Sequence, residues 1–250
     1  MDVGQTDFTY RFDWGIEGLR ALAPAADVVI IVDVLRFTSA VSAAVESGST
    51  VFPYLWDSTS DAAMFAEQRG AVLAGMREDG DLSLSPTDLL TSAPGTRLVL
   101  PSPNGATLAF GAREAGAGRV LAGCLRNATA TALYARTRLE ASSIAVIAAG
   151  ERWGDGPLRP AVEDMLGAGA ILAALDPSGA AGGSRCSPEA RAARAAFLDV
   201  RPRLFEALSA CTSGRELIAR GWEDDVATSA ALDVTTVVAE LIDDAFVAAP

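Results

Sequence analysis

The sequence contains no histidine, and none of its 20 basic residues is a lysine, so every basic side chain is an arginine. A histidine side chain is therefore not available as a general base, a phosphoryl acceptor or a metal ligand. Without lysine, Schiff-base chemistry and a P-loop lysine are excluded. Any side-chain cation that contacts an anionic ligand must therefore be an arginine.

Cysteine is also scarce. The three cysteines, Cys124, Cys186 and Cys211, have no metal-binding spacing, and none is followed six residues later by the arginine of a cysteine-phosphatase loop. An odd number of unpatterned cysteines is typical of reduced thiols, so we expect a cytoplasmic protein. A bound metal would have only oxygen ligands, which favours a hard cation such as Mg²⁺.

Long apolar runs are missing as well. No segment approaches the roughly 20 apolar residues of a membrane span, and the first residues show no basic start followed by an apolar stretch, so we expect neither a membrane anchor nor a signal peptide. A net charge of −12 argues against nucleic acid as a partner. A local arginine cluster can still bind a small anionic substrate, and the sequence leaves a homo-oligomer open.

Half of the 250 residues are hydrophobic, and they follow a repeating pattern. Continuous aliphatic runs at 28–33, 96–101 and 142–150 are each followed by a polar loop and then an alanine-rich stretch. Such runs are typical of strands buried on both faces, and their alternation with helices indicates βα units. The sequence therefore predicts a three-layer α/β/α fold with a mostly parallel or mixed sheet.

We see no second composition class, which predicts a single domain over residues 1–250. A Pro/Gly/Ser-rich stretch at 176–188 predicts a flexible loop, and 189–231 should be a mainly helical C-terminal region. The segment after it has two interpretations: β-branched residues at 235–241 favour a strand, whereas 237–247 also fits a helix.

Polar residues follow the first aliphatic run: Asp33, Arg36 and Thr38. In an open α/β sheet, ligands bind beyond the carboxyl ends of the strands. Thr38 or Ser39 could cap the next helix, whose free amide groups attract anions. The alternative is that Asp33 only accepts hydrogen bonds from loop amides or pairs with Arg36.

The next two runs end in similar ways. Asn104–Gly105 predicts a turn that offers amides to a phosphate, although it also suits an ordinary strand-to-helix turn. Glu163 and Asp164 fall near a helix start, where acids complement the helix dipole or bind a metal. We expect one of them, preferably Glu163, to face the ligand, while the other caps its helix or pairs with an arginine. Six carboxylates lie at the expected ligand edge: Asp33, Asp81, Glu151, Asp155, Glu163 and Asp164.

Several segments, in this order, resemble those of the magnesium-dependent 2-phosphosulfolactate phosphatases. They are "VVIIVDVLRFTSAVSAAVESGS", "AGMREDGDLSLSP", "SPNGATLAF", "AGCLRNATATA", "AAGERWGDGPLRPAVEDMLGAGAIL" and "GWEDDVATSAALDVTTVV". The resemblance spans most of residues 27–238 and adds Asp81, Ser85 and Asn127 as site candidates. Three positions depart from the family pattern, where Ser83, Leu84 and Ala106 replace glycine, asparagine and threonine.

The resemblance implies an Mg²⁺-dependent phosphatase acting on a small anionic phosphomonoester such as 2-phospho-3-sulfolactate. The combined prediction assigns catalysis to Asp33 and Arg36, phosphate binding to Thr38, Ser85, Asn104, Gly105 and Asn127, and the metal to Asp33, Asp81, Glu163 and Asp164. The alternative is a non-catalytic small-anion-binding protein on the same fold. It is suggested by Leu84 and Ala106, which replace polar residues of the family pattern. A Rossmann-type oxidoreductase is a weaker rival, because no Gly-x-Gly-x-x-Gly pattern occurs.

Overall fold

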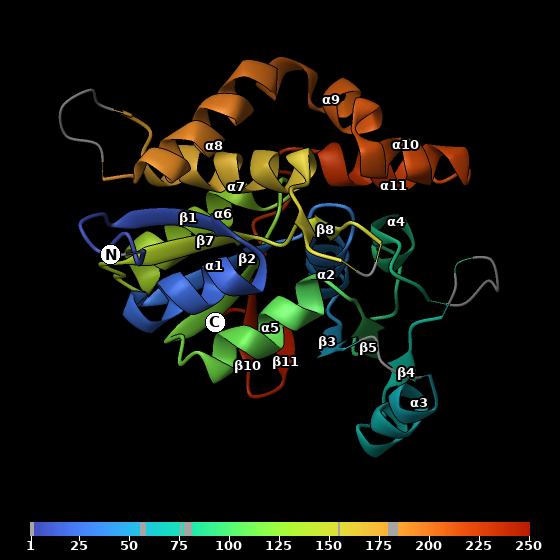
Figure 1. Cartoon of the computed structure of the whole chain (residues 1–250). Coiled ribbons are helices and arrows are strands. Elements are labelled where there is room, and N and C mark those ends of the chain that lie inside the picture. The colour runs from blue at the N-terminus through green and yellow to red at the C-terminus, as the bar shows by residue number, and fades with distance from the viewer. Residues whose placement is uncertain (1–2, 56–58, 76, 78–81, 155, 180–184) are drawn as a thin grey trace.

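A mixed β-sheet forms the centre of the fold (Figure 1). The computed structural model describes residues 3–55, 59–75, 77, 82–154, 156–179 and 185–250. In this part of the chain, nine strands join one sheet in the order β1 (Tyr10–Trp14), β7 (Ile144–Ala148), β2 (Val28–Val32), β6 (Arg119–Gly123), β10 (Ala239–Ile242), β11 (Ala245–Ala248), β3 (Thr50–Tyr54), β5 (Arg97–Pro101) and β4 (Val72–Leu73). A separate short hairpin pairs β8 (Glu151–Arg152) with β9 (Leu158–Arg159).

The sheet consists of two parallel sections joined by an antiparallel hairpin. Strands β1, β7, β2 and β6 are parallel to one another, as are β3, β5 and β4. The hairpin β10–β11 lies between the sections and pairs antiparallel with β6 on one side and with β3 on the other. Three successive antiparallel pairings reverse the direction, so β5 runs opposite to β2.

Helices cover both faces of the sheet (Figure 1), which confirms the predicted three-layer α/β/α fold. All five residues of β2 are buried, with Val28, Ile30 and Val32 in one core cluster and Val29 and Ile31 in the other. The first cluster includes residues of α6 (Ala128–Leu133), α7 (Val162–Leu175) and α8 (Pro188–Val200). The second includes residues of α1 (Gly15–Leu22), α2 (Phe37–Glu46) and α5 (Gly105–Glu114).

In the described part of the chain, the remaining helices are α3 (Thr59–Gln68), α4 (Pro86–Leu89) and the three that follow α8. Helix α3 lies beside β4 and projects from the body, and α4 packs near α2. Helices α8, α9 (Leu204–Ala210), α10 (Thr212–Ala219) and α11 (Glu223–Ala230) occupy the range for which the sequence predicts a mainly helical region. Short 3₁₀ or π segments occur at Ala23–Ala25, Tyr134–Arg138 and Arg201–Arg203. None of the helices in the described residues combines the length and apolar character that a membrane span requires.

The structure describes the ambiguous segment 237–247 and part of the predicted loop at 176–188. The helical alternative for 237–247 is wrong, because this segment contains the hairpin β10–β11. Within the predicted loop at 176–188, residues 180–184 lie outside the described part of the chain. The end of that loop contacts β1, where the Ser187 amide donates to the Tyr10 carbonyl at 2.9 Å. The single-domain prediction stays a prediction.

Small residues allow α7 and α8 to approach closely. A Cβ atom on Gly169 of α7 would lie 2.2 Å from the Ala193 carbonyl oxygen of α8 and 2.7 Å from the Phe197 Cβ. Both contacts are far shorter than van der Waals separation, and the carbonyl belongs to helical backbone that cannot move alone. The glycine therefore sets the distance between the two helices.

We expect Gly169→Ala to lower the free energy of unfolding by about 1–3 kcal/mol, the usual cost of overpacking. Urea unfolding followed by circular dichroism measures this change. Ala195→Ser, on the exposed side of α8, is the control and should stay within about 0.5 kcal/mol of wild type. Unchanged stability of Gly169→Ala would show that the helices can separate at no cost.

Candidate functional site

Asp33 lies directly after β2 and holds the starts of two helices. Its Oδ1 accepts the Phe37 amide of α2 at 3.1 Å, and its Oδ2 accepts the Gly105 amide of α5 at 3.0 Å. The Thr38 hydroxyl is bonded to the backbone of Asp33 rather than exposed to a ligand. Of the interpretations open from sequence, the structure shows Asp33 accepting loop amides, whereas the alternative pairing with Arg36 is wrong.

The Asn104–Gly105 turn meets Asp33 although β5 runs opposite to β2. Five pairings separate these strands in the sheet, and twist accumulates by roughly 20–25° per pairing. The carboxyl ends are therefore not on opposite edges as they would be in a flat sheet. Glycine is required at 105, because a Cβ there would lie 2.2 Å from Cδ1 of Phe37.

Asp164, in the first turn of α7, joins two further loops. Its Oδ1 accepts the Val34 amide at 2.7 Å, and its Oδ2 accepts the Gly150 amide after β7 at 2.9 Å. Asp164 thus neither pairs with an arginine nor caps its own helix. Its neighbour Glu163 is also buried and shares a hydrogen bond with the Cys211 thiol. Burial, together with the Glu163 charge, raises the pKa of Cys211 to about 12.

Glu151, one of the six carboxylates expected at the ligand edge, completes this group of acids. It begins β8, three residues after the end of β7, and it accepts a hydrogen bond of 2.9 Å from the Asn104 side-chain amide. Asn104 therefore connects the turn after β5 to the acid after β7.

These acids repel one another inside the protein. Burial, followed by the charge of Glu151, raises the pKa of Asp33 to about 7. Burial and the charges of Asp33 and Glu163 raise the pKa of Asp164 well above its ordinary value. Burial also raises the pKa of Glu151, against the hydrogen bond from Asn104. In the described ranges no ion pair includes Asp33, Glu163 or Asp164, so each of these acids lacks a cationic side-chain partner when it is ionised.

A divalent cation suits this charge, and the oxygen donors suit Mg²⁺. Within the residues that the structure describes, no three Cys, Asp or Glu side chains form a ready metal cage. Mg²⁺ usually binds one or two protein carboxylates and completes its shell with waters and substrate phosphate, so a full cage is not needed. Asp81, a predicted ligand, lies outside the described residues.

Three arginines, Arg36, Arg77 and Arg220, line a cavity of about 120 Å³. Its other walls include Ser83, Leu84, Leu100 and Trp222. Arg36 lies three residues after Asp33, and the α10–α11 region that supplies Arg220 also contains Cys211, which contacts Glu163. The segment 33–36 and the region around α10 therefore each contribute both to the arginine cavity and to the surroundings of the acids.

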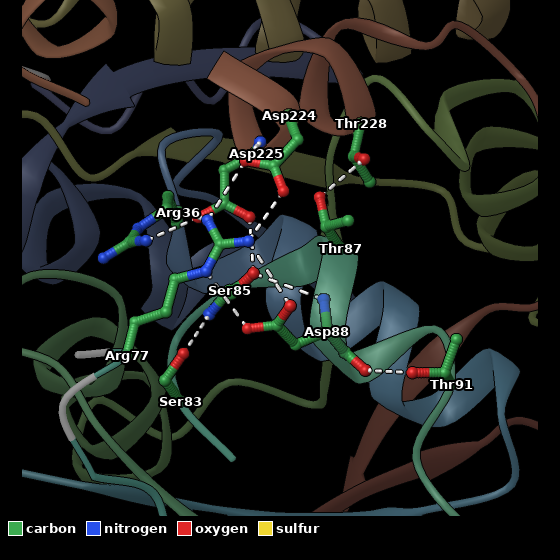
Figure 2. A network of polar contacts seen from close by, with 10 residues as sticks. All are labelled: Arg36, Arg77, Ser83, Ser85, Thr87, Asp88, Thr91, Asp224, Asp225 and Thr228. Atoms are coloured by element: carbon green, nitrogen blue, oxygen red, sulfur yellow. Dashed lines mark hydrogen bonds and ion pairs between the residues drawn. The ribbon is translucent and has the colours of Figure 1, made fainter. Parts of the chain in front are cut away.

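The predicted residue Ser85 supports this cavity from behind. Its hydroxyl donates to Asp225 at 2.5 Å and accepts the Asp88 amide at the start of α4 (Figure 2). Sequence reasoning missed Arg77, Arg220, Trp222 and Asp225. Three of them, Arg77, Trp222 and Asp225, stand in segments that carry the family resemblance, and this was the signal available.

Asn127 is used inside its own loop. Its Oδ1 accepts the Cys124 amide at 3.0 Å, and its Nδ2 donates to the carbonyls of Ala122 and Val237 at 3.3 and 3.4 Å. Each side-chain polar atom thus has a partner, and a role of Asn127 in phosphate binding stays a prediction. Ala106, one of the departures from the family pattern, is a residue of α5 and is buried in the second core cluster.

Residues 18–244 match the family model described as 2-phosphosulpholactate phosphatase. A protein of Thermus thermophilus named as a probable 2-phosphosulfolactate phosphatase is 31% identical over 207 residues, which are 80% of this chain and 81% of that relative. Both matches confirm the resemblance carried by the sequence motifs.

Asp164→Asn tests the role of this carboxylate as a double acceptor. An asparagine NH₂ group would face one of the two backbone donors, so we expect the free energy of unfolding to fall by about 1–3 kcal/mol. Glu163→Gln is the neighbouring control, and it should change stability less because Glu163 accepts no loop amide in the described structure. A rise in the stability of Asp164→Asn, measured in urea, would show that relief of charge repulsion outweighs the lost acceptor.

The raised pKa of Asp33 predicts a pH dependence of stability. Folded Asp33 keeps its proton up to about pH 7, whereas the unfolded residue loses it near 3.8. The folded state binds more protons between these values, so stability falls as the pH rises through this window. We expect the Tm of wild type in EDTA to fall from pH 5 to pH 8, and the Tm of Asp33→Asn to fall less.

Asp27→Asn is the control for this pH series. The pKa of Asp27 is lowered by its hydrogen bond from Ser142, so its contribution to stability is lost only below the unfolded pKa of 3.8. Its replacement should leave the slope between pH 5 and pH 8 unchanged. Equal slopes in wild type and Asp33→Asn would contradict a buried, protonated Asp33.

Proposed function

The chain belongs to the 2-phosphosulpholactate phosphatase family, and we propose that it hydrolyses 2-phospho-3-sulfolactate or a related phosphorylated hydroxy acid with Mg²⁺ as cofactor. The single observation that carries the proposal is a cavity lined by three arginines, one of which, Arg36, follows Asp33 of the buried acid group by three residues. The arginine cavity is suited to bind anionic groups, and the acid group is suited to bind a cation. A phosphatase for a polyanionic substrate requires both.

The arginine cavity supports a substrate with more than one anionic group. 2-Phospho-3-sulfolactate carries a phosphate, a sulfonate and a carboxylate, and arginine binds such oxygens with paired, charge-assisted hydrogen bonds. The cavity of about 120 Å³ is small, which favours a compact anionic group over a nucleotide or a peptide. A second cavity of about 360 Å³ includes Asn104 and Glu151 in its wall, but most of its other lining side chains are apolar, such as Trp14, Ile16 and Leu158. It suits this substrate less well.

The acids support the chemistry of phosphoryl transfer, which depends on positioning and charge neutralisation more than on covalent steps. Glu163 and Asp33 would hold the metal, and a bound Mg²⁺ supplies charge neutralisation and a more acidic water. Asp33 is fixed by two helix amides, so its oxygens stay in place during turnover. Its raised pKa, about 7 in the protein alone, is near the optimum for a group that accepts or gives a proton.

The environment of the cysteines supports a cytoplasmic enzyme. Cys124, Cys186 and Cys211 are all free and buried, as expected where thiols stay reduced.

The direct test is release of phosphate from 2-phospho-3-sulfolactate, with Mg²⁺ or with EDTA. We expect turnover that requires the metal. Arg220→Ala should raise KM by about 10–100-fold, since a hydrogen bond to a charged group is worth roughly 1.5–3 kcal/mol. Arg215→Ala, an exposed arginine on α10, is the matched control and should leave KM unchanged.

Arg36→Lys should also raise KM, because lysine cannot reproduce the paired hydrogen bonds of a guanidinium group. Absence of phosphate release from every phosphorylated hydroxy acid in a panel, with Mg²⁺ present, would leave a small-anion-binding protein as the function. An unchanged KM in both Arg220→Ala and Arg36→Lys would show that the substrate does not bind in the arginine cavity.

A further inference from the structure

Asp225, in the first turn of α11, is a carboxylate with no exposed surface, and three groups converge on it (Figure 2). Arg36 Nη1 lies 2.6 Å from its Oδ2, and Arg77 Nη1 lies 3.3 Å from the same oxygen. The Ser85 hydroxyl donates to its Oδ1 at 2.5 Å. One buried acid thus holds two of the three arginines that line the cavity.

The neighbours of Asp225 hold the same arginines from other sides. The Arg36 guanidinium lies over the Trp222 ring at 4.7 Å, and the Arg220 guanidinium lies over the same ring at 5.4 Å. Arg77 pairs with Asp224 at 2.6 Å and with Asp88 at 3.2 Å (Figure 2). The short segment 222–225 therefore contacts all three arginines of the cavity.

This arrangement leaves donors of Arg36 free for a ligand. Among the described residues, the Arg36 side chain donates a hydrogen bond only through Nη1, so Nη2 and Nε remain available. A free arginine side chain loses about 2 kcal/mol of rotamer entropy when it is ordered. If the side chain is already ordered before the ligand arrives, this entropy loss does not weaken binding. The buried Asp225 is suited to order Arg36 before a ligand arrives.

We propose that Asp225 is a positioning residue that aligns Arg36 and Arg77 for the anionic substrate, an inference that rests on the proposed function of the cavity. Asp225 does not touch the substrate and acts through the arginines. Simple electrostatics predicts the opposite effect, because loss of the Asp225 charge would make the cavity more positive and strengthen anion binding. The sign of the change therefore separates positioning from bulk charge.

The experiment measures binding of inorganic sulfate by calorimetry, and KM and kcat for 2-phospho-3-sulfolactate. In Asp225→Asn we expect the Kd for sulfate and the KM to rise about 10-fold or more, which is roughly 1.4 kcal/mol, while kcat changes much less. A lower Kd, or a fall in kcat with KM unchanged, would overturn the proposal. Sulfate binding needs no turnover, so an Asp225 effect on Kd without phosphatase activity would refute the proposed function and support the positioning role.

A double-mutant cycle shows whether Asp225 acts through Arg36. If it does, Asp225→Asn should have a smaller effect on the Kd for sulfate in an Arg36→Ala background than in wild type. Equal effects in both backgrounds would overturn a role through Arg36. The cycle also separates positioning from a general loss of structure, which would add to the effect of Arg36→Ala.

Thr228→Val is the matched control on the same helix. Its hydroxyl bonds Thr87 at 2.8 Å and connects α11 to α4, and the residue's contact with an arginine is through its backbone carbonyl, to Arg126 outside the cavity. We expect normal sulfate binding in this variant, and a loss equal to that of Asp225→Asn would show that α11 docking alone explains the effect. If Asp225→Asn does not fold, Ser85→Ala removes the 2.5 Å hydrogen bond to Asp225 together with the cap on the Asp88 amide of α4. The same measurements then decide the question, with Thr228→Val as the control for the docking of α4 against α11.

Discussion

The Asp33 carboxylate connects parts of the chain that the sheet alone would keep separate. Its two oxygens accept the first amides of α2 and α5, and these helices follow strands from different sections of the sheet. Asp164 repeats the arrangement between the loops after β2 and β7. Three strand ends are thereby held around one point, although burial of two acids so close together opposes their ionisation.

The two kinds of charge are treated differently by the fold. Each arginine of the cavity has a protein partner, either an aspartate or the Trp222 ring, whereas Asp33, Asp164 and Glu163 have only amides and a thiol. The cationic side is therefore ordered by the protein itself. Among the described residues the acidic side has no such cationic partner, and for this reason the proposed function gives the acids a metal ion and the arginines an anionic substrate.

Local patterns in the sequence predicted the layers of the fold and the position of Asp33, because aliphatic runs and turn residues act over a few positions. The reversed direction of β5 could not be predicted, since it follows from a hairpin at residues 239–248 that inserts between distant strands. The partner of Arg36 was equally hidden, because Asp225 lies 189 positions away. A helix pattern also competed with the strand at β10, where apolar residues suit both periods.

The central position of the hairpin β10–β11 has a consequence for the order of events during synthesis. Every other strand of the described sheet precedes this hairpin in the chain. Until it emerges from the ribosome, β6 and β3 each present an open edge that can pair with another chain. The nascent protein should therefore expose two aggregation-prone strand edges at the same time. It should depend on chaperones that hold it until residues 239–248 pair with both edges.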